Sequence, residues 1–382
     1  MDKSSKFWNK LDYSLRDLPN CMRIILCYRI YRFVLGCSFL LLYIPVNAQK
    51  NDFKIFLVGD AGEDASTGAT LLNLKKQLDS NPFSAVIFLG DNSYKDDLGG
   101  IIPYGFKGFD SSRLTQEKVK SQLNILTNYK GYVFFVPGNH DWWNKTKEQV
   151  GMKKLKMEEN FIERNLDTSL SIANPGNTFF PKNGEAGPAF IDLYDHSLRI
   201  IFVDTYRLII TAYKKKQEAE FPLEKEFYSK LDSLVQDAKK NHQQVIVAGH
   251  NTLYAKGPNT GPLKHPNLFG RIKASNTNFP SNKRMVDKMK KILEQYPGTY
   301  YVCGHIHSLQ YYYPSDSIHY IISGAGSKTN LVSEKDIKKM SPANGNEYNL
   351  WNEKGFFEID FSGSRQRIFM YYADGTQKCE IQ

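Results

Sequence analysis

The chain has 382 residues, enough for one large domain or two, and a core of that size needs no disulfide or structural metal. Its net charge is +10, of which residues 1–48 contribute +4, so about +6 remains on the rest. That surplus suits a small anionic ligand but is too weak to indicate nucleic acid, and no block of Lys and Arg has the length typical of a backbone binder.

Residues 1–48 are predicted to be a targeting segment. Three arginines within residues 23–32 precede an apolar run over 33–46, and Val46-Asn47-Ala48 resembles a small-residue cleavage site. The run is shorter than the ~20 residues that a membrane-spanning helix needs. We therefore expect export to the periplasm, the cell surface or the medium, with membrane attachment through residues 23–46 as the alternative.

Three apolar strands alternate with two helices after this leader. The expected elements are strand 53–58, helix 66–80, strand 85–89, helix 115–129 and strand 131–136. This order favours parallel strands joined by helical crossovers. Each strand is followed by a polar motif that contains glycine: Gly59-Asp60-Ala61-Gly62, Gly90-Asp91-Asn92-Ser93-Tyr94 and Pro137-Gly138-Asn139-His140-Asp141.

The second half is predicted to hold more strands, two of which end in histidine motifs. After a charged helix from about 145, the expected elements are strands 178–182, 187–194 and 198–203, helix 221–241, strand 243–248 ending at Gly249-His250, helix 281–295, strand 299–303 ending at Gly304-His305-Ile306-His307, and strands 309–313, 318–323, 355–360 and 367–372. Residues 251–282 and Lys328–Asn349 are interpreted as loops. No repeat or linker interrupts the chain, so residues 49–382 are expected to form one domain.

The strand ends supply carboxylates, an amide and imidazoles, with a tyrosine close behind: Asp60, Asp91, Asn139, His250, His305, His307 and Tyr94. Because the carboxyl ends of parallel strands share one edge of a sheet, these side chains are expected to lie together. Oxygen and imidazole ligands suit Fe, Mn and Zn, and no Cys is among them. A pair of such cations would polarise a phosphoryl group and generate hydroxide near neutral pH.

Each motif alone has a simpler explanation. Gly-Asp after a strand is a common turn or helix cap, and Gly-His would serve as a satisfied polar group at a sheet edge. The Gly-Asn-His-Asp run at 138–141 and the His-x-His at 305–307 are less common. It is the combination of all five motifs, each after an apolar strand, that favours a metal site.

The motifs also match one known family in order: GDAG at 59–62, GDNSY at 90–94, GNHD at 138–141, AGH at 248–250 and GHIH at 304–307. With them, residues 53–330 resemble the calcineurin-like metallophosphoesterase superfamily, and within it the purple acid phosphatases of the small tartrate-resistant type. The resemblance implies an α/β fold, a four-layer α-β-β-α sandwich with two mixed sheets, which the C-terminal strands would complete.

The resemblance further implies a dinuclear metal centre. Its ferric ion would be held by Asp60, Asp91, Tyr94 and His307. A divalent Fe, Zn or Mn would be held by Asn139, Asp91, His250 and His305, so Asp91 bridges the two ions. The wider superfamily has Asp-x-His where this chain has Asp60-Ala61-Gly62, which fits a site completed by Tyr94. The alternative for Tyr94 is a packed aromatic ring in a Tyr-rich chain.

Two further histidines are candidate catalytic groups. By resemblance, His140 faces the substrate, where it would stabilise the transferring phosphoryl group or protonate the leaving alkoxide. His265, in the loop after His250, is a candidate for a similar role, and a plain surface histidine is the alternative. Asp141 is interpreted as a residue that orients the ligands or shapes the turn.

Together these features predict an exported acid phosphatase that hydrolyses phosphate monoesters by direct attack of metal-bound hydroxide on a small phosphorylated substrate. A phosphodiesterase or nucleotide pyrophosphohydrolase with the same metals is one alternative. A surface binding protein that keeps the fold without catalysis is another. Cys303 ends an apolar strand and is interpreted as a small buried residue, and its pairing with Cys379 is left open.

Overall fold

The computed structural model describes twelve stretches of the chain: residues 53–63, 68–94, 111–142, 148–169, 172–214, 222–256, 280–314, 317–330, 332–334, 347–362, 366–375 and 378–381. All of them belong to one compact unit, Asp52–Gln382. The predicted leader over 1–48 and the candidate His265 lie outside the described residues. No helix within the described stretches combines the length and the apolar character needed to cross a bilayer.

One mixed sheet has six strands in the order β13-β12-β11-β1-β2-β3. Neighbours β1, β2 and β3 run parallel, and the C-terminal strands add to β1 in antiparallel fashion. The strands are β1 (Lys54–Val58), β2 (Ser84–Leu89), β3 (Tyr132–Val136), β11 (Gly355–Asp360), β12 (Arg367–Tyr372) and β13 (Lys378–Glu380).

The other mixed sheet has seven strands in the order β10-β8-β9-β7-β6-β5-β4. Its central strands β5, β6, β7 and β9 run parallel, and β4, β8 and β10 are antiparallel to their neighbours. The strands are β4 (Ala189–Leu193), β5 (Leu198–Phe202), β6 (Gln244–Ala248), β7 (Thr299–Cys303), β8 (Leu309–Tyr312), β9 (Ile318–Ser323) and β10 (Glu347–Leu350). Two mixed sheets were predicted, and this prediction is confirmed.

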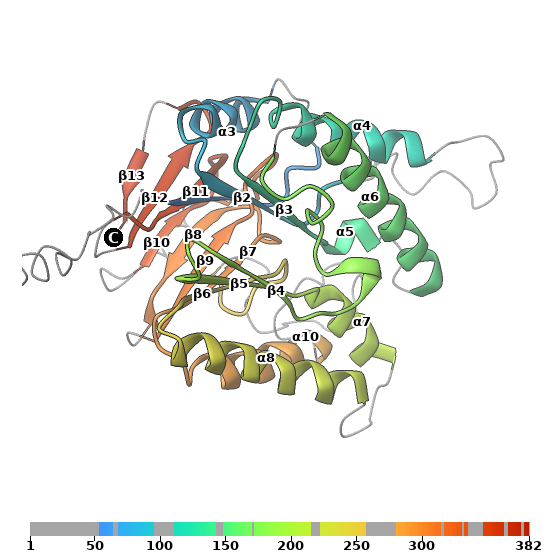
Figure 1. Cartoon of the computed structure of the whole chain (residues 1–382), viewed down its shortest axis with the longest axis vertical. Coiled ribbons are helices and arrows are strands. Elements are labelled where there is room, and N and C mark those ends of the chain that lie inside the picture. The colour runs from blue at the N-terminus through green and yellow to red at the C-terminus, as the bar shows by residue number, and fades with distance from the viewer. Residues whose placement is uncertain are drawn as a thin grey trace, which may run out of the picture. The chain divides into compact units, whose positions relative to one another are not determined.

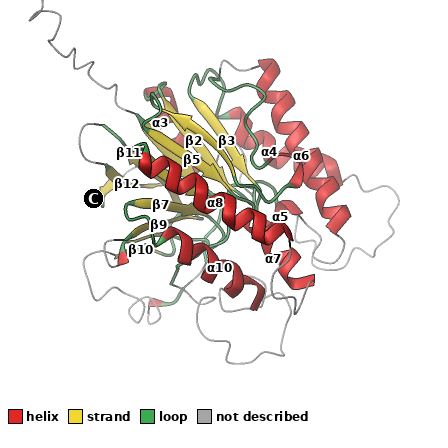
Figure 2. Cartoon of the chain, turned by 60° about the horizontal axis from the view of Figure 1, so that its bottom comes forward, coloured by secondary structure: helices red, strands yellow, loops and turns green. Residues whose placement is uncertain are grey.

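Helices cover the outer face of each sheet, and Figures 1 and 2 show the resulting layers. The six-stranded sheet packs against α3 (Ala69–Ser80), α4 (Ser111–Asn124) and α6 (Glu148–Ser169). The seven-stranded sheet packs against α7 (Thr205–Lys214), α8 (Pro222–Lys240) and α10 (Pro280–Leu293). A short helix, α5 (Asn139–Trp142), follows β3. The architecture is therefore the expected α-β-β-α sandwich.

Alternation along the strands accounts for three separate apolar layers. In β1, Ile55 and Leu57 belong to the cluster between the sheets, whereas Phe56 and Val58 belong to the cluster under α3. Successive side chains of a strand point to opposite faces, so an unbroken apolar strand is the pattern of a sheet covered on both sides. Phe134 of β3 meets Phe202 of β5 across the middle layer, with ring centroids 5.0 Å apart.

The elements differ from the expected ones in several places. Residues 178–182 form only one bridge, Phe135 with Phe179, because the Glu163 carboxylate accepts the backbone N–H groups of Thr178 and Phe179. Strand β10 overlaps the end of the stretch Lys328–Asn349 that was interpreted as a loop, and its half-buried side chains gave little apolar signal. Helix α7 was not predicted, because it starts directly after a strand, with Asp204 as its cap.

Candidate metal centre

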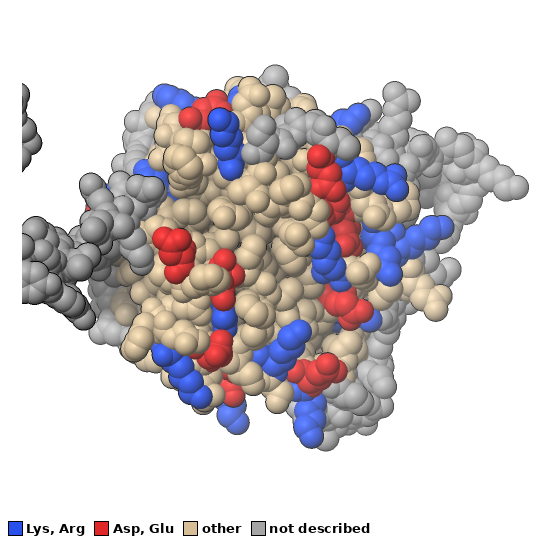
Figure 3. Space-filling model, in the orientation of Figure 1, with Lys and Arg blue, Asp and Glu red and all other residues tan. Residues whose placement is uncertain are grey.

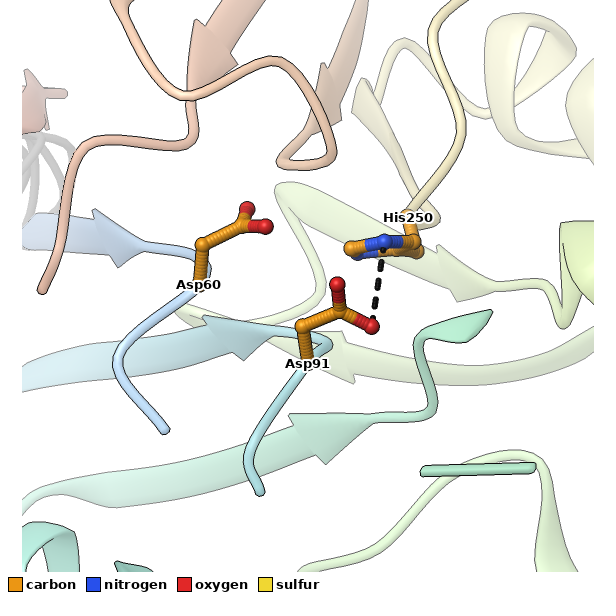
Figure 4. Close-up of side chains that lie close together, drawn as sticks. All are labelled: Asp60, Asp91 and His250. Atoms are coloured by element: carbon orange, nitrogen blue, oxygen red, sulfur yellow. Dashed lines mark ion pairs between the residues drawn. The ribbon is translucent and has the colours of Figure 1, made fainter. Parts of the chain in front are cut away.

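Two aspartates turn away from neighbouring strand ends toward the same point. Asp60 follows β1 and Asp91 follows β2, and both have a left-handed backbone conformation, with φ of 57° and 52°. His305, after β7, has φ of 70°. Such a conformation costs a non-glycine residue about 1–3 kcal/mol and persists only where the surroundings hold it. Figure 4 shows both carboxylates directed toward the ring of His250, which follows β6.

One group of donor atoms surrounds Asp60. The Tyr94 hydroxyl donates a hydrogen bond to Asp60 Oδ1 at 2.6 Å and lies 3.2 Å from Nε2 of His307. The same His307 nitrogen is 3.3 Å from Asp60 Oδ1. Burial, together with the charges of Asp60 and Asp91, raises the pKa of Tyr94 well above its usual value. Its proton would therefore be displaced only by a strongly charged cation.

A second group of donor atoms surrounds Nε2 of His250. Asn139 Oδ1 lies 3.1 Å away, His305 Nδ1 3.3 Å and Asp91 Oδ1 3.4 Å. Burial and the neighbouring His250 lower the pKa of His305 to about 3, so its ring is neutral and offers a lone pair. An amide oxygen, two imidazole nitrogens and a carboxylate thus converge on one point.

The orientation of His250 is set by a backbone contact. Its Nδ1 lies 2.8 Å from the carbonyl of Leu89, which can only accept, so Nδ1 carries the proton and Nε2 faces the carboxylates. Burial lowers the pKa of His250, but Asp91 and Asp60 more than offset this and raise it to about 10. The carboxylates that attract a proton at Nε2 would equally attract a cation, and the two compete for the same position.

The two groups share Asp91 and fit a pair of hard cations. One ligand atom from each of Asp60, Asp91 and His250 lies within 4.8 Å of the others, and all three residues are buried. Carboxylates and imidazoles packed this closely are costly to bury unless positive charge joins them. Nε2 of His305 is also buried without a hydrogen-bond partner among the described residues. Oxygen and nitrogen donors of this kind suit Fe, Mn and Zn.

Comparison with known proteins decides the family. The model of the calcineurin-like phosphoesterase family matches residues 53–309, which include every predicted metal ligand. This chain belongs to the calcineurin-like phosphoesterase family. Within the curated proteins it is similar to tartrate-resistant acid phosphatase type 5 of the rabbit, Oryctolagus cuniculus, with 25% identity over 265 residues. That match covers 68% of this chain and 65% of the length of the rabbit protein.

The solved structure of PhoD shares the fold of this calcineurin-like phosphoesterase. The structure of PhoD superposes with a TM-score of 0.50 and 10% identity, over 87% of this chain and 72% of that one. GAP50, described as the anchor in the inner membrane complex of Plasmodium, has a TM-score of 0.49 and 14% identity, over 86% and 88% of the two chains. At these identities the likeness concerns the fold alone.

Below the predicted metal ligands, two buried acids hold the loops that carry them. Asp141 accepts the backbone N–H groups of Gly138 at 2.7 Å and Ser93 at 3.0 Å, which joins the loops after β2 and β3. Glu158 of α6 accepts hydrogen bonds from Asn92 and Ser93 at 3.3 Å each. Burial raises the pKa of both acids, and the Glu158 charge raises that of Asp141 further. A side chain at Gly138 would overlap Asp91, which explains the glycine.

Behind His250, the end of β5 supports the opposite side of the site. The fully buried Asp204 accepts hydrogen bonds from Trp142 Nε1 at 2.7 Å and from the backbone of Arg207 at 2.9 Å. The next residue, Thr205, accepts the backbone N–H of Asn251 at 3.0 Å. Thr205 therefore holds the backbone at His250 and Asn251. Burial raises the pKa of Asp204 to about 7.

Asp204 should make the stability of the protein depend on pH. Its folded pKa lies above the usual value near 4, so its favourable contribution is present at low pH and is lost as pH rises toward 7. Asp204→Asn removes this loss. Between pH 5 and pH 8, the free energy of unfolding of wild type should therefore fall by about 2–3 kcal/mol more than that of the variant. Urea denaturation at both pH values measures the difference.

A constant cost of Asp204→Asn, such as a poorer cap on α7, cancels in that comparison. Asp79→Asn on α3, which removes an exposed carboxylate paired with Lys75, serves as the control and should leave the pH dependence of stability unchanged. Equal pH dependence in wild type and Asp204→Asn would contradict the raised pKa.

The structure thus brings together seven residues predicted as ligands: Asp60, Asp91, Tyr94, Asn139, His250, His305 and His307. His140 is exposed beside them, with its ring 4.6 Å from that of Tyr94. His265 lies outside the described residues. The contacts by which Glu158 and Asp204 hold the surrounding loops were not predicted.

Proposed function

We propose that this phosphoesterase is an exported acid phosphatase that hydrolyses phosphate monoesters, with Fe(III) and a divalent Fe, Zn or Mn as its metals. The observation that carries the proposal is the pair of donor groups that share Asp91, one of which contains the Tyr94 hydroxyl. The similarity to the rabbit acid phosphatase favours monoesters over diesters. Export is supported by the arginines and the apolar run of the leader.

Seven residues of the chain would hold the two metals. Asp60, Tyr94 and His307 would hold one cation, and Asn139, His250 and His305 the other, with Asp91 in both sets. When bound, the two cations would supply Lewis-acid charge for the phosphoryl group and lower the pKa of water at the site. The attack would be direct, so the chain itself forms no covalent bond to phosphate.

His140 is placed to act on the substrate. Its backbone N–H donates to Asp91 Oδ1 at 2.8 Å, and its imidazole packs on the ring of Tyr94 while remaining exposed. The backbone contact fixes the residue against the carboxylate, so the exposed ring sits beside the centre without being one of its ligands. From there it would donate a hydrogen bond to the phosphoryl oxygens or a proton to the leaving alkoxide.

Turnover of two nitrophenyl esters tests the proposal. Purified protein, reconstituted with iron and zinc, should hydrolyse p-nitrophenyl phosphate at least ~10-fold faster than bis(p-nitrophenyl) phosphate, because the dianionic group suits a dimetal site. A preference for the bis-ester would replace the proposal with a phosphodiesterase. Metal binding below about one ion per chain, with no turnover, would indicate a silent binding protein. N-terminal sequencing of cell fractions tests export.

A further inference from the structure

Lys328 places an ammonium group directly on a predicted metal ligand. Its Nζ lies 3.0 Å from the centroid of the Tyr94 ring, and it is 3.1 Å from Oε1 of Glu63. The hydroxyl of Tyr94 in turn contacts Asp60 and His307. The ammonium group therefore lies over the ring of a residue whose hydroxyl is itself among the donor atoms. Lys328 is outside the five motifs, and its position was not expected.

The backbone next to Lys328 is fixed to the Asp60 loop. Gly326 N donates to Gly59 O and Ser327 N to Asp60 O, each at 3.1 Å, and Ser327 Oγ accepts the N–H of Glu63 at 3.2 Å. These bonds join Gly326 and Ser327 to residues 59, 60 and 63. The hydrogen-bonded backbone of residues 326–327 therefore holds Lys328 in position over the Tyr94 ring.

Lys328 also lies on the open side of the site. The side chains of Asp60 and Asp91 are 0% and 2% exposed, whereas those of His307 and Lys328 are 22% and 24% exposed. His140, which contacts the same Tyr94 ring, is exposed as well. Among the described residues, a substrate that reaches the centre from this side meets Lys328 and His140 around Tyr94. Figure 3 shows Lys and Arg intermingled with Asp and Glu on the face that it draws.

The contact with Glu63 does not by itself explain a lysine here. The Glu63 side chain is 42% exposed, and partly exposed ion pairs add little to stability. An ammonium group has three N–H donors, and Glu63 accepts one of them. A second donor faces the Tyr94 ring, and the third has no acceptor among the described residues. A phosphate oxygen that arrives from the open side is an acceptor of the matching charge for it.

We propose that Lys328 binds the phosphate group of the substrate beside the metal centre, an inference that rests on the proposed phosphatase function. The ammonium group would hold the phosphate in the ground state and in the transition state alike. Such uniform binding affects KM and the affinity for product phosphate more than kcat. Glu63 would oppose this by competing for the same ammonium group.

Phosphate affinity of three variants tests the role of Lys328. With metal-reconstituted protein and inorganic phosphate as the probe in calorimetry, Lys328→Met should raise the Kd about 10-fold, and Lys328→Arg should recover most of the affinity. KM for p-nitrophenyl phosphate should rise in parallel, with kcat within about twofold. Glu63→Gln should have the opposite sign and tighten phosphate binding about twofold, since it frees the ammonium group.

Lys118→Met is the matched control. Lys118 Nζ donates to the backbone oxygen of the same Glu63 at 3.0 Å, so this variant loses one positive charge in the same neighbourhood. It should change the Kd less than twofold. An equal loss in Lys118→Met would mean that net charge alone acts, and it would overturn the inference.

Other outcomes separate the inference from the proposed function. A Lys328→Met protein that binds phosphate as wild type does, while wild type turns over monoesters, would overturn the role of Lys328 only. Loss of metal from Lys328→Met, measured by elemental analysis, would assign Lys328 to the metal centre instead and would also overturn the inference. A wild type that neither binds phosphate nor turns over monoesters would overturn both.

Discussion

Asp91→Asn should lower turnover of p-nitrophenyl phosphate by about 10³-fold or more and should reduce the metal content of the protein. Burial alone would raise the pKa of Asp91, but His250 and His140 hold it well below its usual range, so the group is a carboxylate. Its carboxylate lies close to both donor groups. An amide of the same shape keeps the packing but removes the anion between the two predicted cations. Steady-state kinetics and elemental analysis measure the two effects.

The control for this variant is Asp79→Asn, which removes an exposed carboxylate on α3 and should leave turnover and metal content unchanged. Thermal unfolding of Asp91→Asn should remain cooperative, which would exclude misfolding as the cause. Turnover within about tenfold of wild type, with two metals still bound, would show that Asp91 does not bridge the centre.

Tyr94→Phe should abolish the visible absorption of the iron-loaded protein. If Tyr94 binds Fe(III) as a phenolate, the wild type is purple or pink through charge transfer from phenolate to iron. Phe lacks the oxygen, so the variant should be colourless even where iron remains bound. The Tyr94 side chain is nearly fully buried and already contacts Asp60 and His307 through this oxygen, so the phenyl ring fits the same space. Absorption spectra normalised to iron content provide the measurement.

Tyr129→Phe is the matched control, because Tyr129 is also buried and its hydroxyl pairs with Ser84 at 2.8 Å, within a cluster that lacks the metal ligands. Its colour should equal that of wild type. A coloured Tyr94→Phe protein would assign the band to another ligand. An active wild type without iron or colour would refute the ferric assignment and leave a dimetal phosphoesterase with two divalent ions.

The candidate site was accessible from sequence because its ligands follow strands with a strong local pattern. Asp60 and Asp91 stand directly after apolar runs, and parallel strands bring such positions to one edge regardless of the detailed packing. His250 and His305 follow the same rule in the other sheet. That two sheets face each other with these edges aligned is a property of the whole fold, and it was predicted only through the family resemblance.

Supporting residues could not be predicted because nothing near them in sequence marks their partners. Glu158 is one of several acids on a charged helix, and its contact with Ser93 spans 65 residues. Lys328 is one of many lysines, and Glu63, its ionic partner, is 265 residues away. The predicted elements were also wrong where local signals were weak. The edge strand β10 has only half-buried residues, and the backbone N–H of Phe179 donates to the Glu163 side chain, so the strand predicted there does not form.

The donor atoms come from both sheets, and this has a mechanical consequence. Asp60 follows a strand of one sheet, whereas His305 follows a strand of the other, 245 residues later in the chain. Cations held between them would act as a clamp that closes very long loops of the unfolded chain, as a disulfide does. The two sheets would then be held together at the edge that carries the candidate site. A chelator that removes the metals would lower the stability of the whole molecule as well as abolish turnover.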